Sequence, residues 1–202
     1  LGKIHQQTAN NSELAKVFAY DDNFFSLRLD PYLGETSRVH PKYSVFIQAV
    51  LERTQSTKLA LVHGDISPKN ILRGPTGPVI LDAECAWYGD PAFDLAFCLN
   101  HFLLKTIAAN RCVARQQLML CFEKLYQRYF NCIRWESIDG FENRVAALLP
   151  CLTLARVAGK SPVEYLTEGQ AQNVRRISCA LLERQFTTLT DITLFWRKES
   201  GL

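Results

Sequence analysis

The stretch LVHGDISPKNIL, residues 61–72, places four polar side chains, His63, Asp65, Lys69 and Asn70, between two apolar runs. A side chain at the end of a strand is held by the sheet while its tip faces open space, which suits a catalytic group. The same residues also fit a plain loop with a helix cap. The rest of the chain has to separate these two interpretations.

Short apolar runs surround the motif. KLALVHG (58–64), NILRG (70–74) and PVILDAE (78–84) have the length of strands, and PTGP between the last two is typical of a turn. The sequence therefore predicts a small hairpin that follows the motif. Asp82 and Glu84 end its second strand, on the same face if the alternation of the strand continues.

Most of the remaining chain has apolar residues at helical spacing. RLDPYLGETSRVHP (28–41) is the exception and is predicted to be irregular, because it contains Pro31, Gly34 and Pro41. The predicted fold is α+β and predominantly helical, with a few short strands around the polar motif. The predicted helices cover residues 1–9, 12–19, 42–56, 91–105, 113–130, 137–149, 151–158, 170–186 and 190–197.

The composition limits the class of protein. The chain has 202 residues, 48% of them hydrophobic, and a net charge of +3, which fits one globular domain. So balanced a charge gives no reason to expect binding to nucleic acid or to a membrane, and no apolar stretch is long enough to span a bilayer. The seven cysteines are scattered, and the first twenty residues lack the apolar core of a signal peptide. We expect a cytoplasmic protein, and nothing indicates its oligomeric state.

Phosphoryl transfer needs the residue types found here. One carboxylate must orient or accept the proton of the attacking hydroxyl, and hard oxygen ligands must hold Mg²⁺ against the nucleotide phosphates. Asp65 is the candidate base. Asn70 and Asp82 are candidate Mg²⁺ ligands, and Glu84 is a further acidic group beside them.

Three segments resemble one known superfamily. HGDISPKN (63–70) is similar to the catalytic loop H-G-D-x-x-x-x-N of the aminoglycoside phosphotransferase and choline kinase superfamily, whose fold is protein kinase-like. ILDAE (80–84) resembles its metal motif, and GDPAFDLA (89–96) the segment that follows. The D-x-E form is also similar to methylthioribose kinase, whose catalytic loop lacks the Asn.

The resemblance implies a role for each matching residue. Asp65 would be the catalytic base, Asn70 and Asp82 would bind Mg²⁺, and Glu84 would assist at the metal. His63 would support the loop through packing and hydrogen bonds. Asp94 would be the buried carboxylate that accepts backbone N–H groups of the catalytic loop. Asp90, before Pro91, is explained better as a helix N-cap.

The motifs lie in residues 1–105, and residues 106–202 form a helical tail on the substrate side. No G-x-G-x-x-G precedes His63, and no strand supplies the Lys that binds phosphates in this superfamily. We therefore expect a single domain, a kinase-like C-terminal lobe, without the N-terminal lobe that clamps the nucleotide. The chain begins with Leu1, so we expect a fragment that is inactive alone.

Substrate contacts are predicted less directly. The segment LARVAGKSPVEYL (154–166) offers Arg156, Lys160, Glu164 and Tyr165, which would line a substrate pocket if it is not a plain helix–helix connection. Four acidic side chains between residues 21 and 35 would attract a cationic substrate if they are not simply solvated. They are Asp21, Asp22, Asp30 and Glu35.

The predicted function is transfer of a phosphoryl group from ATP or GTP, with Mg²⁺, to a hydroxyl of a small molecule. The substrate is not identified, because aminoglycosides, choline, amino acids and sugars are all acceptors in this superfamily. Two other classes fit the residues. One is a pseudokinase-like binding protein without turnover, and the other is a metal-dependent hydrolase of phosphate esters.

Overall fold

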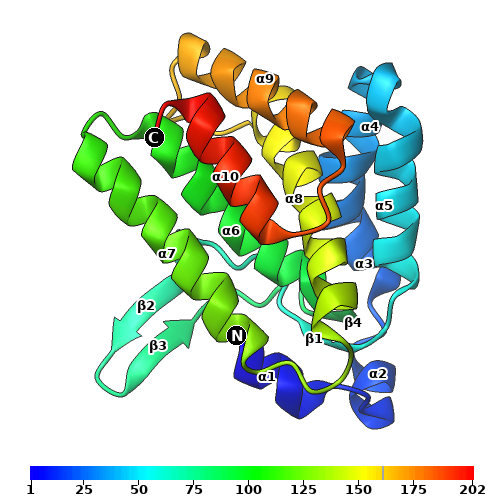
Figure 1. The fold of residues 1–202 in the computed structure, drawn as a ribbon. Helices are drawn as coiled ribbons and strands as arrows, with labels where there is room; N and C mark the ends of the chain where they lie inside the picture. Colours follow the sequence, from blue (N-terminus) through cyan, green and yellow to red (C-terminus); the bar gives the residue numbers. More distant parts are fainter. Residues whose placement is uncertain (161) are drawn as a thin grey trace.

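A computed structural model describes residues 1–160 and 162–202. Helices dominate these residues and the strands are few and short, so the predicted α+β, predominantly helical fold is confirmed (Figure 1). Asn11 caps the second helix by accepting hydrogen bonds from the N–H groups of Glu13 and Leu14. The helices before the first strand are α1 (Gly2–Thr8), α2 (Ser12–Val17), α3 (Asp21–Phe24), the π-helix η1 (Phe25–Gly34), α4 (Glu35–Val39), the 3₁₀-helix η2 (Pro41–Tyr43) and α5 (Ser44–Ser56).

A bundle of five longer helices forms the rest of the body, and the predicted helices at 91–105, 113–130, 170–186 and 190–197 are all part of it. The central helix of this bundle is buried almost all round, because it packs against the two helices that follow it. Figure 1 shows it between these two helices. The bundle consists of α6 (Pro91–Ala108), α7 (Cys112–Phe130), α8 (Ile138–Ala158), α9 (Glu168–Arg184) and α10 (Leu189–Ser200).

Local caps fix where several of these helices begin. Asp90, Ser137, Thr167 and Thr188 each accept a hydrogen bond from an N–H in the first turn of α6, α8, α9 and α10. At α9 the side chain of Gln170 also accepts from the N–H of Thr167, which completes a capping box. Replacing such a cap by Ala costs about 1 kcal/mol.

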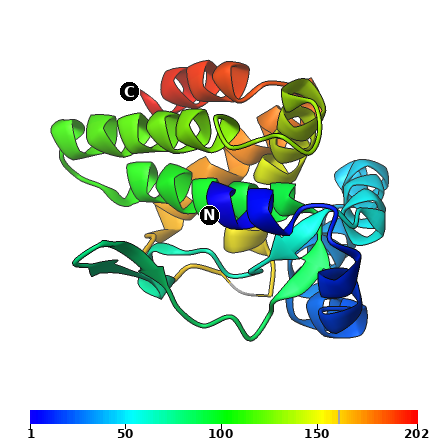
Figure 2. The same ribbon diagram turned by 90° about the horizontal axis from the view of Figure 1, so that it is seen from below.

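The strands form two separate antiparallel pairs. The pair β1 (Ala60–Val62) and β4 (Trp87–Gly89) closes residues 63–86 into one loop. Inside that loop lies the predicted hairpin, β2 (Ile71–Gly74) and β3 (Gly77–Ile80), which projects from the helical body (Figures 1 and 2). A 3₁₀-turn, η3 (Pro68–Asn70), leads into β2.

The prediction of strand 78–84 is only partly right. The strand ends at Ile80, and Asp82 has a φ of 67°, which an extended strand does not allow. The alternation of side chains therefore does not continue to Glu84. The three residues of β4 were not predicted as a strand, because Trp-Tyr-Gly is too short to show a period.

The prediction of irregular structure at 28–41 is wrong, since η1 and α4 cover most of it. Pro31 has no N–H to donate and would break a regular α-helix, whereas it is contained here in the wider turns of a π-helix. Leu29, Tyr32 and Leu33 are buried in the core. Their burial stabilises a helix that the local sequence disfavours.

Helix α8 also differs from the prediction made from the sequence. Residues 137–149 and 151–158 were predicted as two helices separated by Pro150, but α8 runs from Ile138 to Ala158 with Pro150 inside. Side chains on both sides of Pro150 are buried against α6 and α9. This burial outweighs the hydrogen bond that Pro150 cannot make.

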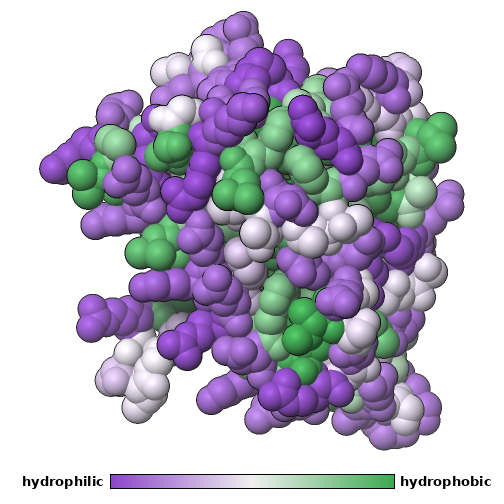
Figure 3. All heavy atoms as spheres, in the orientation of Figure 1, coloured by the Kyte–Doolittle hydropathy of each residue, from purple (hydrophilic) through white to green (hydrophobic). Residues whose placement is uncertain are grey.

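The surface is mainly hydrophilic on the face that Figure 3 shows, with hydrophobic side chains in separate patches. None of the helices in residues 1–160 and 162–202 combines the length and the apolar character that crossing a membrane requires. All seven cysteines are free thiols.

Candidate active site

The loop that carries the polar motif leaves β1 through a glycine with a left-handed backbone. Gly64 has a φ of +81°, and a Cβ there would lie 2.9 Å from the carbonyl oxygen of Cys85 and 3.0 Å from the ring of Phe24. Conformation and space thus both require glycine at this position. The next residue of the turn is Asp65.

A buried carboxylate fixes the backbone of this turn through hydrogen bonds. Asp94 of α6 accepts hydrogen bonds from the N–H groups of His63 and Gly64, both at 2.8 Å. These are the bonds that the family resemblance implies for Asp94. His5 of α1 donates from Nε2 to the same carboxylate at 3.1 Å. Three donors compensate a carboxylate that is completely buried.

His5 is itself oriented by Tyr129 of α7, whose hydroxyl contacts Nδ1. Burial raises the pKa of Tyr129 well above its usual value, so its hydroxyl keeps its proton and donates. Where Nδ1 accepts from that hydroxyl, Nε2 carries the proton that reaches Asp94. A chain of hydrogen bonds therefore runs from α7 to the catalytic loop.

His63 ties the loop to the hairpin. Its Nδ1 accepts from the N–H of Asp65 at 3.2 Å, which leaves the ring proton on Nε2. Nε2 then donates to the carbonyl oxygen of Leu81 at 3.0 Å. The N–H of Leu81 in turn donates to the carbonyl oxygen of Asn70 at 2.8 Å.

Asp65 lies at the centre of the loop and is 7% exposed. Asn70 donates from Nδ2 to the carbonyl oxygen and to Oδ2 of Asp65, both at 3.0 Å. Two cations face the same oxygen: Nη2 of Arg28 at 3.3 Å and Nζ of Lys69 at 3.5 Å. Arg28 also donates from Nε to the carbonyl oxygen of Gly64 at 2.7 Å. These contacts fix the carboxylate in one orientation.

Asp82 and Glu84 follow the hairpin and are exposed. Asp82 comes directly after Leu81, which binds both His63 and Asn70, so its backbone is anchored to the catalytic loop. Burial raises the pKa of the Cys85 thiol. The charge of Arg28 opposes this rise, and the charges of Glu84, Asp65 and Asp82 add to it.

A pocket of about 200 Å³ reaches Asp65. Arg156 of α8 is one of its lining residues, so one of the four predicted substrate residues lies beside the candidate base. Lys160 and Glu164 are exposed and do not line it. Tyr165 is 44% exposed, with Nζ of Lys105 5.2 Å from its ring centre. Ser161, in the middle of the predicted segment, lies outside the described residues.

The family of the chain follows from a comparison with known proteins. Residues 1–123 match the phosphotransferase enzyme family (APH). The chain belongs to this family. No curated protein matches the chain.

Membership in the phosphotransferase family makes the chain a phosphotransferase of the kinase-like superfamily, a class that binds a nucleotide and a small substrate. Such enzymes generally use ATP and Mg²⁺. The likeness to methylthioribose kinase stays a prediction, as do the roles of the individual residues.

The residues fit a magnesium ion that arrives with its nucleotide. Both N–H groups of the Asn70 amide are used on Asp65, which leaves its oxygen free to accept. The Asp82 carboxylate has no hydrogen-bond donor among the described residues. No cluster of three or more His, Cys, Asp or Glu side chains in those residues would hold a metal by itself. Mg²⁺ ordinarily takes one or two protein carboxylates and completes its shell with water and phosphate oxygens.

The sequence did not single out several residues of this candidate site. Arg28 contacts Asp65, His5 contacts Asp94, and His101 lines the pocket beside Asp65. Neither His5 nor His101 has a partner at short spacing in the sequence. Their partners are distant in the chain, so no local pattern pointed to them.

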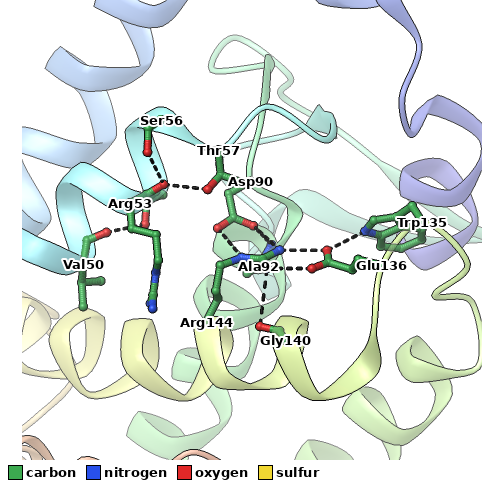
Figure 4. A network of polar contacts seen from close by, with 11 residues as sticks. Val50, Arg53, Ser56, Thr57, Asp90, Ala92, Trp135, Glu136, Gly140 and Arg144 are labelled. Atoms are coloured by element: carbon green, nitrogen blue, oxygen red, sulfur yellow. Dashed lines mark hydrogen bonds and ion pairs between the residues drawn. The ribbon is translucent and has the colours of Figure 1, made fainter.

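A second polar network supports the start of α6 and is shown in Figure 4. Arg144 of α8 binds the buried Asp90 through Nε at 2.9 Å and Nη2 at 3.2 Å, and binds Glu136 at 2.6 Å. Burial raises the pKa of the Asp90 carboxyl, and Arg144 opposes this rise. Asp90 also caps α6, as predicted. Arg53 points away from this pair toward α8.

The four acidic residues of segment 21–35 do not line the Asp65 pocket. Asp30 and Glu35 pair with Arg38, and Asp21 pairs with Lys58. A larger cavity of about 310 Å³, lined partly by Arg53 and Phe186, contains none of the predicted site residues.

Proposed function

We propose that this chain is the C-terminal lobe of a small-molecule kinase, which transfers the terminal phosphoryl group of ATP or GTP to a hydroxyl of its substrate. The observation that carries the proposal is the fixed, largely buried carboxylate of Asp65, which lines a pocket. Family membership supplies the reaction class, and Asp65 supplies the position at which a hydroxyl would react.

Asp65 would accept a hydrogen bond from the substrate hydroxyl and orient its oxygen toward the phosphoryl group. In this kind of transfer, positioning and electrostatic stabilisation account for most of the acceleration. Lys69 and Arg28 would stabilise negative charge next to the transferred group, because both cations already face the Asp65 carboxylate.

Asn70 and Asp82 would hold Mg²⁺, with Glu84 as a further acidic group near it. The ion, when bound, neutralises charge on the nucleotide phosphates. His63 and Asp94 would act through the backbone, since their hydrogen bonds set the position of Asp65 and of the loop that carries Asp82.

The hairpin supplies a surface for the nucleotide. Leu72 and Val79 are paired across its strands and are 52% and 48% exposed, and Leu81 is 41% exposed. Three apolar side chains with this much exposure, beside the loop that would bind the metal, suit contact with the flat face of a nucleotide base. We propose that residues 1–105 form the catalytic core, that residues 106–202 form the substrate side, and that a segment outside residues 1–202 covers the nucleotide from above.

The test is Mg²⁺-dependent ATP and GTP consumption by this chain and by the full reading frame that contains it, with a panel of hydroxylated acids, amines and sugars. Asp65→Asn should lower kcat by about 10²–10⁴-fold in the active form, as expected for a positioned base. Asp139→Asn is the matched control, because Asp139 is an exposed carboxylate on α8 outside the site.

Two results would contradict the proposal. Full turnover in Asp65→Asn would remove the assigned base. Cleavage of phosphate esters without a nucleotide would indicate a hydrolase instead. Nucleotide binding without any turnover, in both forms and with every acceptor, would favour a binding protein.

A further inference from the structure

The pocket beside Asp65 contains an unusual concentration of unsatisfied polar atoms. Oγ of Ser67, Nε2 of His101 and Nε of Arg156 are all buried, and none has a hydrogen-bond partner among the described residues. All three residues line this pocket. Native proteins leave few buried polar groups unpaired, so a cluster of three calls for a ligand or ordered water that pairs with them.

The charges of the pocket are unbalanced. Arg28, Lys69 and Arg156 line it with a single carboxylate, Asp65, which leaves two positive charges in excess. Arg28 and Lys69 both face Asp65, whereas Arg156 forms no ion pair with any described residue. An uncompensated guanidinium in a partly buried site is unfavourable unless an anion binds there.

Arg156 is held in place for such a role. Its Nη1 donates to the hydroxyl of Tyr32 at 3.2 Å, and its guanidinium carbon lies 5.8 Å from the centre of the Tyr32 ring. Both contacts orient the group without neutralising it. The planar guanidinium presents its remaining N–H donors in the geometry that suits a carboxylate or a phosphate.

His101 adds a hydrogen-bonding group without adding a charge. Burial, together with the nearby cations Arg156, Lys105 and Lys69, lowers its pKa to about 4, so the ring is neutral at pH 7. The ring packs edge-on against Phe97, which fixes its direction. Ser67 and His101 can therefore complete the hydrogen bonds of an anion that Arg156 binds.

We infer that the acceptor is a small hydroxy compound with an oxyanion, a carboxylate or a phosphate, which Arg156 binds while Asp65 receives the hydroxyl. This inference rests on the role proposed for Asp65 and adds the class of substrate. A cationic acceptor such as choline or ethanolamine would bring its charge next to two uncompensated positive charges. A pocket volume of about 200 Å³ suits a small molecule.

The first experiment measures kcat/KM of the full reading frame with matched acceptors: glycerate, its uncharged amide glyceramide, glycerol 3-phosphate and ethanolamine. We expect the oxyanionic compounds to exceed glyceramide by about tenfold or more, which is the effect of about 1.4 kcal/mol of binding energy. A preference for ethanolamine or for the neutral amide would overturn the inference. Glycerate and glycerol 3-phosphate distinguish a carboxylate from a phosphate.

The second experiment does not depend on turnover. Calorimetry measures binding of glycerate and of glycerol 3-phosphate to the unmodified protein and to Arg156→Gln. Affinity should fall about tenfold or more in the variant, and Arg156→Lys should recover part of it. Arg175→Gln is the control, because Arg175 is exposed on α9 and donates to the carbonyl oxygen of Val157 near the same end of α8.

The outcomes separate this inference from the proposed function. Anion binding that depends on Arg156 but occurs without phosphorylation would support the anion site and count against the kinase. Phosphorylation of amines or neutral alcohols, with no effect of Arg156→Gln on the KM of the acceptor, would support the kinase and overturn the anion site. If neither anion binds, or if both bind Arg156→Gln as well as the unmodified protein, the inference is wrong.

Discussion

Asp90 and Asp94 lie one helical turn apart at the start of α6, and both are completely buried, yet they stabilise different parts of the molecule. Asp90 is paired with a cation, Arg144, which comes from α8. Asp94 is paired with two backbone N–H groups of the catalytic loop and with His5. The first carboxylate joins two helices, and the second positions the candidate active site.

The type of partner explains why one carboxylate joins two helices and the other positions a loop. An ion pair holds two rigid elements together but does not define the path of a loop. Two N–H donors on consecutive residues, His63 and Gly64, define that path, because both peptide planes must face the same carboxylate. A variant that disturbs Asp90 should therefore mainly lower stability, and a variant that disturbs Asp94 should mainly lower activity.

The largest effect on stability is expected from Arg144→Met. It leaves the buried Asp90 without its cation, and the loss of one partner from a buried pair typically costs about 3–5 kcal/mol of unfolding free energy. Turnover per folded molecule should stay unchanged. Urea unfolding and activity measured well below the transition check both points.

Arg128→Met is the control for that variant, because Arg128 is exposed on α7. Its unfolding free energy should change by no more than about 0.5 kcal/mol. If Arg144→Met lost turnover while still folded, the division between the two aspartates would not hold.

Asp94→Asn should cause a smaller loss of stability and a larger loss of activity. An amide offers one oxygen, so one loop N–H remains unpaired at a cost of about 1–3 kcal/mol. A displaced Asp65 should lower kcat by about 10²-fold, the effect of a misplacement near 1 Å. Steady-state kinetics and urea unfolding of the same sample measure both changes. An unaltered kcat would show that Asp94 does not position the loop.

Replacing His101 should have the smallest effect on stability, and the size of that effect depends on pH. The folded protein keeps His101 neutral down to a pKa of about 4, whereas the unfolded chain binds a proton below about pH 6.5. Stability from this residue is therefore complete above pH 6.5 and decreases as the pH falls toward 4. The loss between pH 6.5 and 5.5 is about 1 kcal/mol. Unfolding of His101→Gln over this range should show a weaker decrease, and an equal decrease would contradict the assignment.

Much of this arrangement was predictable from the sequence where the signals are local. The caps at Asn11 and Asp90 use neighbouring residues, and the hairpin follows from two apolar runs around a turn. The expected hydrogen bonds of Asp94 were implied by the motif GDPAFDLA. In each case the signal and the structure lie within a few residues of each other.

Features that depend on distant partners were not predictable. Pro31 and Pro150 both indicated a break, but burial in the core keeps each inside a helix. Arg28, Arg144 and His5 find their partners through the packing of separate helices. An isolated His or Arg in a sequence does not show which carboxylate it will meet.

The pairing of β1 with β4 has a consequence for how the molecule opens. It closes residues 63–86 at their base, and none of the side chains in that segment belongs to the main hydrophobic core of the described residues. Such a segment can unfold locally while the helices stay intact, with amide exchange faster than that of α6. The groups that would perform the chemistry thus form a small cooperative unit of their own, and damage to that unit would leave the body of the protein folded.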